Sequence, residues 1–270
     1  MRQYEIIERR RSVRTFLSES LRESTVDFIN HYIEKVNMLK GPFGHSIKLY
    51  THDMSNQKRV GTYGIIKNPA MYIAGTTHNS IEGIMDYGYL FERMILDFTE
   101  KNIGTCWMAG TFKRDDFDII KEDEIMPAVT PIGYFDNTRF FENMMRKVVK
   151  SDLRLPFEQL FFDENFETPL KEEKAGPFKE ALMAVRIGPS ASNKQPWRVL
   201  KQANSIHLYL EENKKYNETL PFKVQYLDMG IAMYHLEAIL KENDFEGQWI
   251  KEEPDVKLPN ENYKYIVTYK

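Results

Sequence analysis

Residues 188–197 read Gly-Pro-Ser-Ala-Ser-Asn-Lys-Gln-Pro-Trp, and the second half of the chain is organised around this loop. Proline fixes φ, so a loop bounded by Pro189 and Pro196 is stiff. Its Ser, Asn and Gln side chains offer hydrogen-bond donors and acceptors at fixed positions. Such a loop suits the edge of a heteroaromatic ring with alternating N–H and C=O groups. The simpler alternative is a plain connection between a helix and a strand.

Regular elements are predicted on both sides of this loop. Residues 177–187 are helical in pattern and end at its first two residues. Residues 197–200 and 206–210 are typical of a β-hairpin. A long helix over 225–243 and a strand over 263–269 complete this half.

The first half of the chain has a similar order of elements. Apolar residues at helical spacing predict a helix over 23–38, which Gly41-Pro42 stops. A second, largely apolar helix is predicted over 81–101, with Gly104 placed to end it. A short helix is also predicted from about 4 to 8, and strands over 46–50, 70–74 and 128–134.

The two long helices share a residue-level pattern. Asp86 lies near the start of the first and Trp107 follows its end, while Asp228 and Trp249 hold the corresponding places in the second at the same separation. A Gly-Pro pair precedes both helices. The alternative is chance similarity between two helices, but the pattern favours an internal duplication. Duplicated halves usually pack about a pseudo-twofold axis.

The predicted fold class is therefore α+β, with two repeated halves around a pseudo-twofold axis and mixed, mainly antiparallel sheets. The halves are residues 1–155 and 156–270. Because the repeat supplies each half with a partner inside the chain, we expect a monomer. A dimer in which halves are exchanged between chains is the alternative.

Four arginines and a serine lie within residues 9–14. Guanidinium groups give permanent charge and bidentate hydrogen bonds, which suit a phosphate. Crowding so many like charges is unfavourable unless an anion neutralises them. The alternatives are a solvated surface cluster or a nucleic-acid patch.

Four segments resemble the nitroreductase family. Residues 10–16 are similar to its Arg-Arg-Ser-x-Arg-x-Phe signature, and residues 189–197 to its Pro-Ser-x-x-Asn-x-Gln-Pro-Trp loop. Residues 103–112 resemble its Leu-Gly-x-x-x-x-x-Gly-x-Phe segment, and residues 154–156 its Arg-x-Pro element. The resemblance implies the nitroreductase-like fold and an FMN cofactor.

The order of the segments departs from the usual family pattern. In ordinary members the Pro-Ser loop follows the arginine signature closely, whereas here that place is taken by Gly41-Pro42-Phe43-Gly44-His45. Conversely, the second half begins without an arginine cluster and has no Gly-rich segment after Trp249. The chain thus resembles the internally duplicated branch of the superfamily. This implies one complete and one degenerate flavin site per chain, with His45 in a structural role.

The resemblance assigns roles to individual residues. Backbone N–H groups of Ala109 and Gly110 would reach flavin N5 and O4, and residues 61–64 would line the pyrimidine side. The family usually has a lysine where this chain has Asp152, so Lys147 or Lys150 would substitute. The phosphate and ribityl end would be held by Arg10, Arg11, Ser12, Arg14 and Arg154, and the isoalloxazine ring bordered by Pro189, Ser190, Ala191, Ser192 and Asn193.

The resemblance implies an oxidoreductase in which NAD(P)H reduces the flavin and a nitroaromatic, quinone or similar small acceptor reoxidises it. No side chain is needed as a catalytic group, because the redox chemistry belongs to the cofactor. The chain also lacks a Rossmann Gly-x-Gly-x-x-Gly motif, which agrees with a nicotinamide that only visits the flavin. The alternatives are a flavin-binding sensor or carrier without turnover, and a nucleic-acid-binding domain that would leave the Pro-Ser loop unexplained.

Composition limits the remaining possibilities. The net charge of −3 and a pI near 6.1 give no global attraction to nucleic acid or an anionic membrane. No apolar run has the length of a membrane span or signal segment. The single cysteine, Cys106, fits a reducing compartment and is expected to pack as a small apolar residue. The histidines are scattered along the sequence, so we expect no metal site, and we expect a cytoplasmic protein.

Overall fold

The computed structural model describes residues 1–53, 60–136, 153–218 and 220–270. The chain divides into two compact units, one of residues 9–152 and the other of residues 153–270 together with residues 1–8. The boundary after residue 152 lies close to the one predicted from the sequence. Residues 1–8 fall in the unit of the C-terminal half, whereas the predicted halves group them with the N-terminal one.

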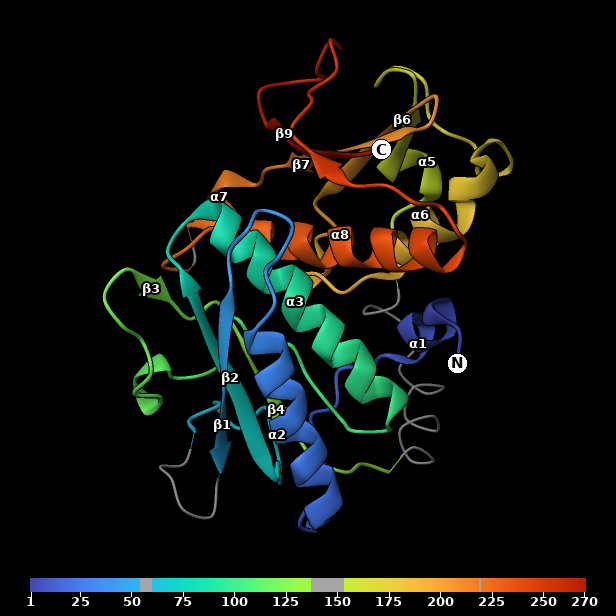
Figure 1. Cartoon of the computed structure of the whole chain (residues 1–270). Helices are drawn as coiled ribbons and strands as arrows, with labels where there is room; N and C mark the ends of the chain where they lie inside the picture. Colours follow the sequence, from blue (N-terminus) through green and yellow to red (C-terminus); the bar gives the residue numbers. More distant parts are fainter. Residues whose placement is uncertain (54–59, 137–152, 219) are drawn as a thin grey trace. The chain divides into compact units, whose positions relative to one another are not determined.

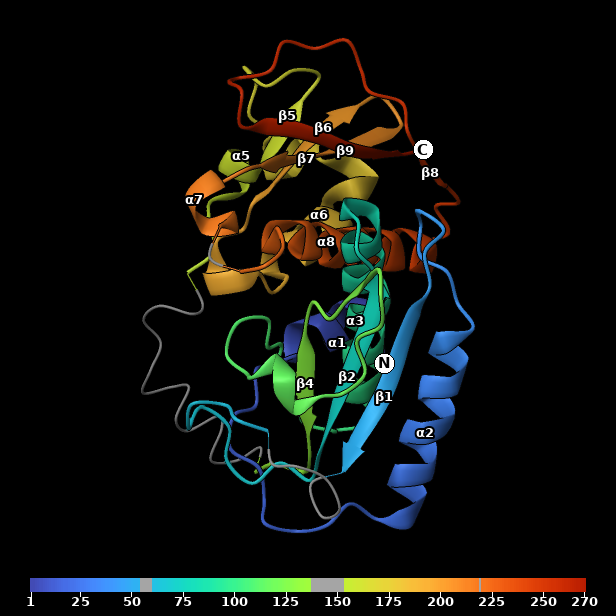
Figure 2. The same ribbon diagram turned by 90° about the vertical axis from the view of Figure 1, so that its left-hand side faces the viewer.

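The unit of residues 9–152 contains an antiparallel four-stranded sheet covered by two helices. Strand order is β1-β2-β3, and β4 also pairs with β2. Helices α2 and α3 lie on this sheet, α2 against β1 and α3 against both β1 and β2 (Figures 1 and 2). The elements are α2 (Glu23–Asn37), β1 (Ile47–Asp53), β2 (Met71–His78), α3 (Ile81–Glu100), η1 (Arg114–Asp116), β3 (Glu124–Ile125) and β4 (Val129–Ile132).

Helix α3 begins and ends at polar caps. Ser80 has an extended backbone, and its side chain accepts a hydrogen bond from the backbone N–H of Gly83 at 3.0 Å. At the other end Asn102 adopts a left-handed conformation (φ 57°), so the chain turns there and not at Gly104 as predicted. Gly104 is needed for a different reason: a Cβ at this position would lie 2.9 Å from Phe135 and 3.0 Å from the Gly133 carbonyl.

The second unit contains a five-stranded sheet in the order β5-β6-β7-β9-β8. Only the β5–β6 pair is parallel, so the sheet is mixed and mainly antiparallel, as predicted. Helices α6 and α8 pack against each other, and α8 contacts β6 and β7 (Figure 2). The elements from residue 153 onwards are α5 (Phe157–Leu160), β5 (Phe161–Asp163), η2 (Glu172–Lys174), η3 (Gly176–Phe178), α6 (Lys179–Ile187), η4 (Ala191–Asn193), β6 (Trp197–Gln202), β7 (Ser205–Glu211), α7 (Lys214–Asn217), α8 (Val224–Glu242), β8 (Trp249–Ile250) and β9 (Tyr263–Tyr269).

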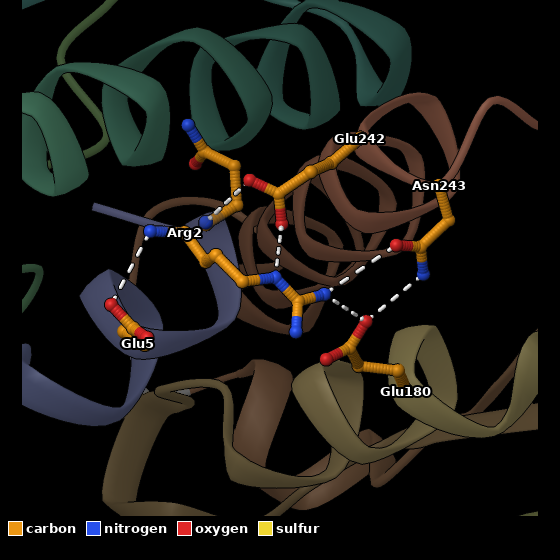
Figure 3. A network of polar contacts seen from close by, with 6 residues as sticks. Arg2, Glu5, Glu180, Glu242 and Asn243 are labelled. Carbon is orange, nitrogen blue, oxygen red and sulfur yellow. Dashed lines mark hydrogen bonds and ion pairs between the residues drawn. The ribbon is translucent and has the colours of Figure 1, made fainter.

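The N-terminal helix α1 (Gln3–Arg9) is joined to this second unit by a polar network. The Arg2 guanidinium lies 2.7 Å from Glu180 on α6 and 3.7 Å from Glu242 on α8 (Figure 3). Asn243 bonds both Arg2 and Glu180, and the backbone N–H of Gln3 donates to Glu242 at 2.9 Å. Arg2 and Gln3 therefore connect the start of α6 with the C-terminal end of α8.

The two units share one order of elements. In each, a helix precedes an antiparallel hairpin, a long helix follows, and a later strand pairs with the second hairpin strand. In the first unit these are α2, β1, β2, α3 and β4, and in the second α6, β6, β7, α8 and β9. We propose that this shared order and pairing derive from an internal duplication. Over the residues described, neither long helix is apolar enough to cross a membrane, nor is any shorter one.

Candidate functional site

The arginine segment is held in an extended conformation within its unit. The backbone of Val13 donates to the Thr105 carbonyl at 2.8 Å, and the Arg14 carbonyl accepts from the backbone of Lys67 at 2.8 Å. Phe16 then donates to the Lys67 carbonyl at 3.0 Å. Val13 and Phe16 are buried in the core, whereas Arg14 is exposed. These backbone bonds fix which way each side chain of the motif is presented.

Arg10, Ser12 and Arg14 gather around Cys106. Burial raises the pKa of the Cys106 thiol, and Arg14, a hydrogen bond with the Ser12 side chain and Arg10 oppose that rise. The thiol lies in the core, only 3% exposed, as predicted for a packed residue. Arg10 has a second neighbour, since its Nε lies 4.0 Å from a carboxylate oxygen of the fully buried Glu92.

Arg11 has a different environment from these three residues. With Arg9 it lines a small cavity whose other walls include Thr105 and Asn102. Its Nη1 donates to the Arg10 carbonyl at 2.9 Å, and Arg9 donates to the Asn102 side chain at 2.7 Å. Of the predicted phosphate ligands in this segment, the structure thus brings Arg10, Ser12 and Arg14 together at Cys106 and places Arg11 beside Arg9.

The segment after Cys106 presents two backbone donors. Met108 pairs with Val129 in both directions, at 3.0 and 2.9 Å, which fixes the chain just before Ala109. Arg114 donates to the Ala109 carbonyl at 2.6 Å, so that carbonyl is held in place. In the part of the chain that the structure describes, the N–H groups of Ala109 and Gly110 donate no hydrogen bond. Ala109 is half-buried and Gly110 exposed, so both groups remain available to an acceptor.

The loop over residues 61–64 belongs to the same unit and is anchored at its first residue. The Gly61 N–H donates to Asp116 at 2.7 Å, and its carbonyl accepts from the backbone of Lys113 at 3.0 Å. Tyr63 has φ 51° and is 71% exposed at the tip of this turn.

The Pro-Ser loop lies in the other unit and contains several residues in unfavourable backbone conformations. Ser192, Asn193 and Gln195 have φ of 50°, 54° and 49°, the left-handed region that side chains other than glycine rarely adopt. The buried Gln195 holds the loop. Its Oε1 accepts from the backbone of Leu155 at 2.8 Å, and its backbone N–H donates to Ser190 Oγ at 2.9 Å.

Arg154 is tied directly to this loop. Its Nη1 donates to the side chain of Asn193, and its Nη2 to the Ile187 carbonyl at 2.9 Å. Asn193 in turn donates to the Leu153 carbonyl at 3.0 Å. The Arg-x-Pro element and the Pro-Ser loop therefore form one hydrogen-bonded group. Lys147, Lys150 and Asp152 lie outside the described residues.

Two aspartates contact the loops that follow the Gly-Pro pairs. In the sequence these aspartates stood out only because they occupy matched positions in the two halves. Asp86 on α3 accepts from the backbone of Phe43 at 3.0 Å and of His45 at 2.8 Å. Asp228 on α8 accepts from the backbone of Ala191 at 2.9 Å. In the sequence, the matched positions of the two aspartates indicated a repeat, but they did not disclose that each aspartate anchors a loop.

The two tryptophans of the repeat also behave alike. Trp107 Nε1 donates to Glu92 at 2.6 Å, and Trp249 Nε1 donates to Glu237 at 2.6 Å. Both carboxylates lie on the long helix of their own unit and are buried. His45 is positioned by its backbone bond to Asp86 and stacks on His78, with ring centroids 5.4 Å apart. Among the described residues, no three His, Cys, Asp or Glu side chains gather as metal ligands.

Comparison with known proteins assigns the family. The sequence profile described as "Putative TM nitroreductase" matches residues 2–239, so the chain belongs to this nitroreductase family. The fold is similar to the crystal structure of a "putative nitroreductase" from Thermotoga maritima, with a TM-score of 0.63 and 22% identity, covering 100% of this chain and 92% of that one. The nitroreductase-like fold predicted from the sequence is thus confirmed. A comparison with curated proteins finds no match.

Two further solved structures contain the cofactor that the sequence resemblance implies. A nitroreductase from Bacteroides fragilis with bound FMN has a TM-score of 0.37 and 16% identity, over 50% of this chain and 89% of that one. A "putative nitroreductase" from Exiguobacterium sibiricum in complex with FMN has a TM-score of 0.44 and 11% identity, over 59% and 95%.

Proposed function

We propose that this protein is an FMN-dependent oxidoreductase that takes electrons from NAD(P)H and passes them to a nitroaromatic, quinone or similar small acceptor. Membership of the nitroreductase family supports this function. The observation that carries it is a pair of adjacent N–H groups, at Ala109 and Gly110, that donate to no other described residue and lie in the same unit as Arg10, Ser12 and Arg14. Bound flavin would supply the chemistry by accepting a hydride and releasing electrons to the acceptor.

The residues present fit the two ends of such a cofactor. Arg10 and Arg14 provide charge for a phosphate, and Ser12 provides a hydroxyl beside them. The N–H groups of Ala109 and Gly110 suit a ring edge that gains negative charge, because backbone donors stabilise an anion without offering an acid. We assign Arg11 and Arg154 to the phosphate end as well. For Arg154, the bonds to Asn193 and Ile187 support a second role in holding the Pro-Ser loop.

In the second unit we assign Pro189, Ser190, Ala191, Ser192 and Asn193 to the border of the isoalloxazine ring. The unfavourable φ angles of Ser192 and Asn193 support this assignment, because strained backbone concentrates at ligand sites. We further propose that residues 61–64 line the pyrimidine side, that the protein is cytoplasmic and that it works as a monomer.

Flavin absorbance tests this function most directly. The purified protein, incubated with FMN and dialysed, should be yellow, and heat should release FMN rather than FAD. Under anaerobic conditions the visible absorbance band of the oxidised flavin should bleach on addition of NADH or NADPH and return with a quinone. A colourless protein after saturation with FMN would contradict the cofactor. A yellow protein that neither nucleotide bleaches would indicate the second candidate, a flavin-binding sensor or carrier.

A further inference from the structure

Asp228 connects α8 to the Pro-Ser loop through one hydrogen bond from the backbone of Ala191 at 2.9 Å. The carboxyl group is only 2% exposed. Two residues of the short helix that begins at Ala191, Ser192 and Asn193, have left-handed backbone conformations. Such conformations are unfavourable for residues other than glycine and persist only where surrounding contacts enforce them. The bond to Asp228 fixes the residue immediately before this strained pair.

The first unit offers an internal comparison. Asp86 contacts the corresponding loop, but both of its carboxyl oxygens accept backbone N–H groups, one from Phe43 and one from His45. Asp228 uses only Oδ1. Its Oδ2 is fully buried and has no hydrogen-bond partner within the described residues. Two aspartates at matched positions therefore differ in whether their second oxygen is satisfied.

This difference bears on the charge of Asp228. An ionised oxygen buried without a donor is costly, whereas a neutral carboxyl group keeps Oδ1 as the acceptor for Ala191 at a much lower cost of burial. Burial raises the pKa of Asp228 well above its ordinary value, against the smaller opposing effect of the Ala191 hydrogen bond. The same geometry predicts that asparagine replaces Asp228 well and Asp86 poorly, because an amide NH₂ would face a backbone N–H only at Asp86.

We propose that Asp228 is a positioning residue for flavin binding, which in its neutral form holds Ala191 and so sets the conformation of residues 189–193. This inference rests on the proposed FMN function and on the assignment of these residues to the flavin ring. Asp228 acts through the loop and is not itself a ligand of the flavin, because its oxygens lie buried beneath the backbone that it holds.

Three variants test the anchor from both of its ends. Asp228→Ala removes the acceptor, Ala191→Pro removes the donor, and Asp228→Asn keeps a neutral acceptor. Proline is compatible with position 191 because the preceding Ser190 is extended (φ −143°, ψ 156°). We expect Asp228→Ala and Ala191→Pro each to weaken FMN binding about tenfold. Because both substitutions remove the same hydrogen bond, the double variant should bind FMN only slightly more weakly than either single variant.

Asp228→Asn should bind FMN within roughly threefold of the wild type and restore the wild-type flavin spectrum, which Asp228→Ala should alter. If the ionised carboxylate of Asp228 were needed only for stability, the Asp228→Asn substitution would not restore FMN binding and the flavin spectrum. The matched control is Asp86→Asn, for which we expect full FMN occupancy and lower stability. If Asp228→Asn binds as weakly as Asp228→Ala, the neutral form is wrong. If Ala191→Pro binds FMN like the wild type, the anchor is irrelevant to flavin binding, whether or not Asp228→Ala folds.

Amide hydrogen exchange of the flavin-free protein separates this inference from the proposed function. Exchange at Ala191 should be slow in the wild type and in Asp228→Asn, and faster in Asp228→Ala, whatever ligand the protein takes. A wild type that binds no FMN would refute the proposed function. A wild type that binds FMN, with Asp228→Ala unchanged both in affinity and in Ala191 exchange, would refute the positioning role alone.

Discussion

At the scale of single residues, Asp86 gives the first unit a pH-dependent stability. Burial raises its pKa to about 6 from an ordinary value of 3.8, and the bonds from Phe43 and His45 oppose that rise. The folded state therefore holds this proton more tightly than the unfolded chain does. As the pH falls through 6 the folded state is favoured, and above 6 that contribution is lost.

Asp86→Asn should remove this dependence. Between pH 7 and pH 5 we expect the wild type to gain about 1.3 kcal/mol of unfolding free energy relative to the variant. Urea unfolding of both proteins at the two pH values measures the gap, because other titrating groups contribute equally to each. If the difference in unfolding free energy between the wild type and the variant stays constant or becomes smaller toward pH 5, Asp86 has an ordinary pKa.

Arg14 and Arg10 should respond differently to truncation. Arg14 is exposed, so Arg14→Ala should leave the melting temperature almost unchanged and weaken FMN binding roughly 10- to 100-fold, the worth of one charge-assisted phosphate contact. Arg10→Ala should also lower stability, because it removes a cation from beside the buried Glu92. Flavin titration with thermal melts of both variants makes the comparison, with Lys35→Ala on α2, at an exposed position, as a charge-matched control. Unchanged flavin affinity in Arg14→Ala would remove that residue from the phosphate site.

At the scale of elements, the Pro-Ser loop depends on the amide of Gln195. Its Oε1 accepts a backbone N–H of Leu155, while its Nε2 donates to the carbonyls of Leu153 and Asn193, both at 3.3 Å. In Gln195→Glu the hydrogen bond from the Leu155 N–H is kept. The second carboxylate oxygen, however, would face the carbonyl oxygens of Leu153 and Asn193, which it would repel. We expect a loss of about 1–3 kcal/mol in stability at pH 8 that is smaller at pH 5, where the new carboxyl group can be protonated and donate. Equal losses at both pH values would argue against these contacts.

The longer elements follow from sequence because their patterns are strong. The hairpin, both long helices and the last strand lie within a few residues of their predicted positions. The short elements β3, β5, β8 and α5 were missed, since two to four residues carry no periodicity. The end of α3 lies within a residue of its predicted place, but Asn102 and not Gly104 adopts the left-handed turn that follows it.

Some residues of the candidate site could be predicted from the sequence, and others could not. Its motifs identify Arg10, Ser12, Arg14 and the Pro-Ser loop because several residues recur at fixed spacing. Asp228 and Glu92 act through tertiary contacts with Ala191 and Trp107, and such contacts leave no local pattern. The matched Asp and Trp positions of the two halves were the only trace of them in the sequence.

At the scale of the whole molecule, the two units share one order of elements but carry different residues with ligand-binding chemistry. Each long helix carries an aspartate bonded to its loop and a buried glutamate bonded to a tryptophan. The glutamates differ in place, since Glu92 follows Asp86 by fewer residues than Glu237 follows Asp228. The framework of the halves is thus similar, while the residues with ligand-binding chemistry are not.

That inequality predicts the stoichiometry of the cofactor. The arginine signature and the Ala109-Gly110 segment occur only in the first half, and the intact Pro-Ser loop only in the second. Since no motif is present twice, the chain has the parts for one flavin, and we expect one FMN per chain in a monomer. Flavin absorbance against protein concentration gives the ratio, and light scattering gives the mass. Two flavins per chain would refute the degenerate second site. A dimer that loses its flavin on dilution would show that halves of different chains complete each other, which keeps the ratio at one but overturns the monomer.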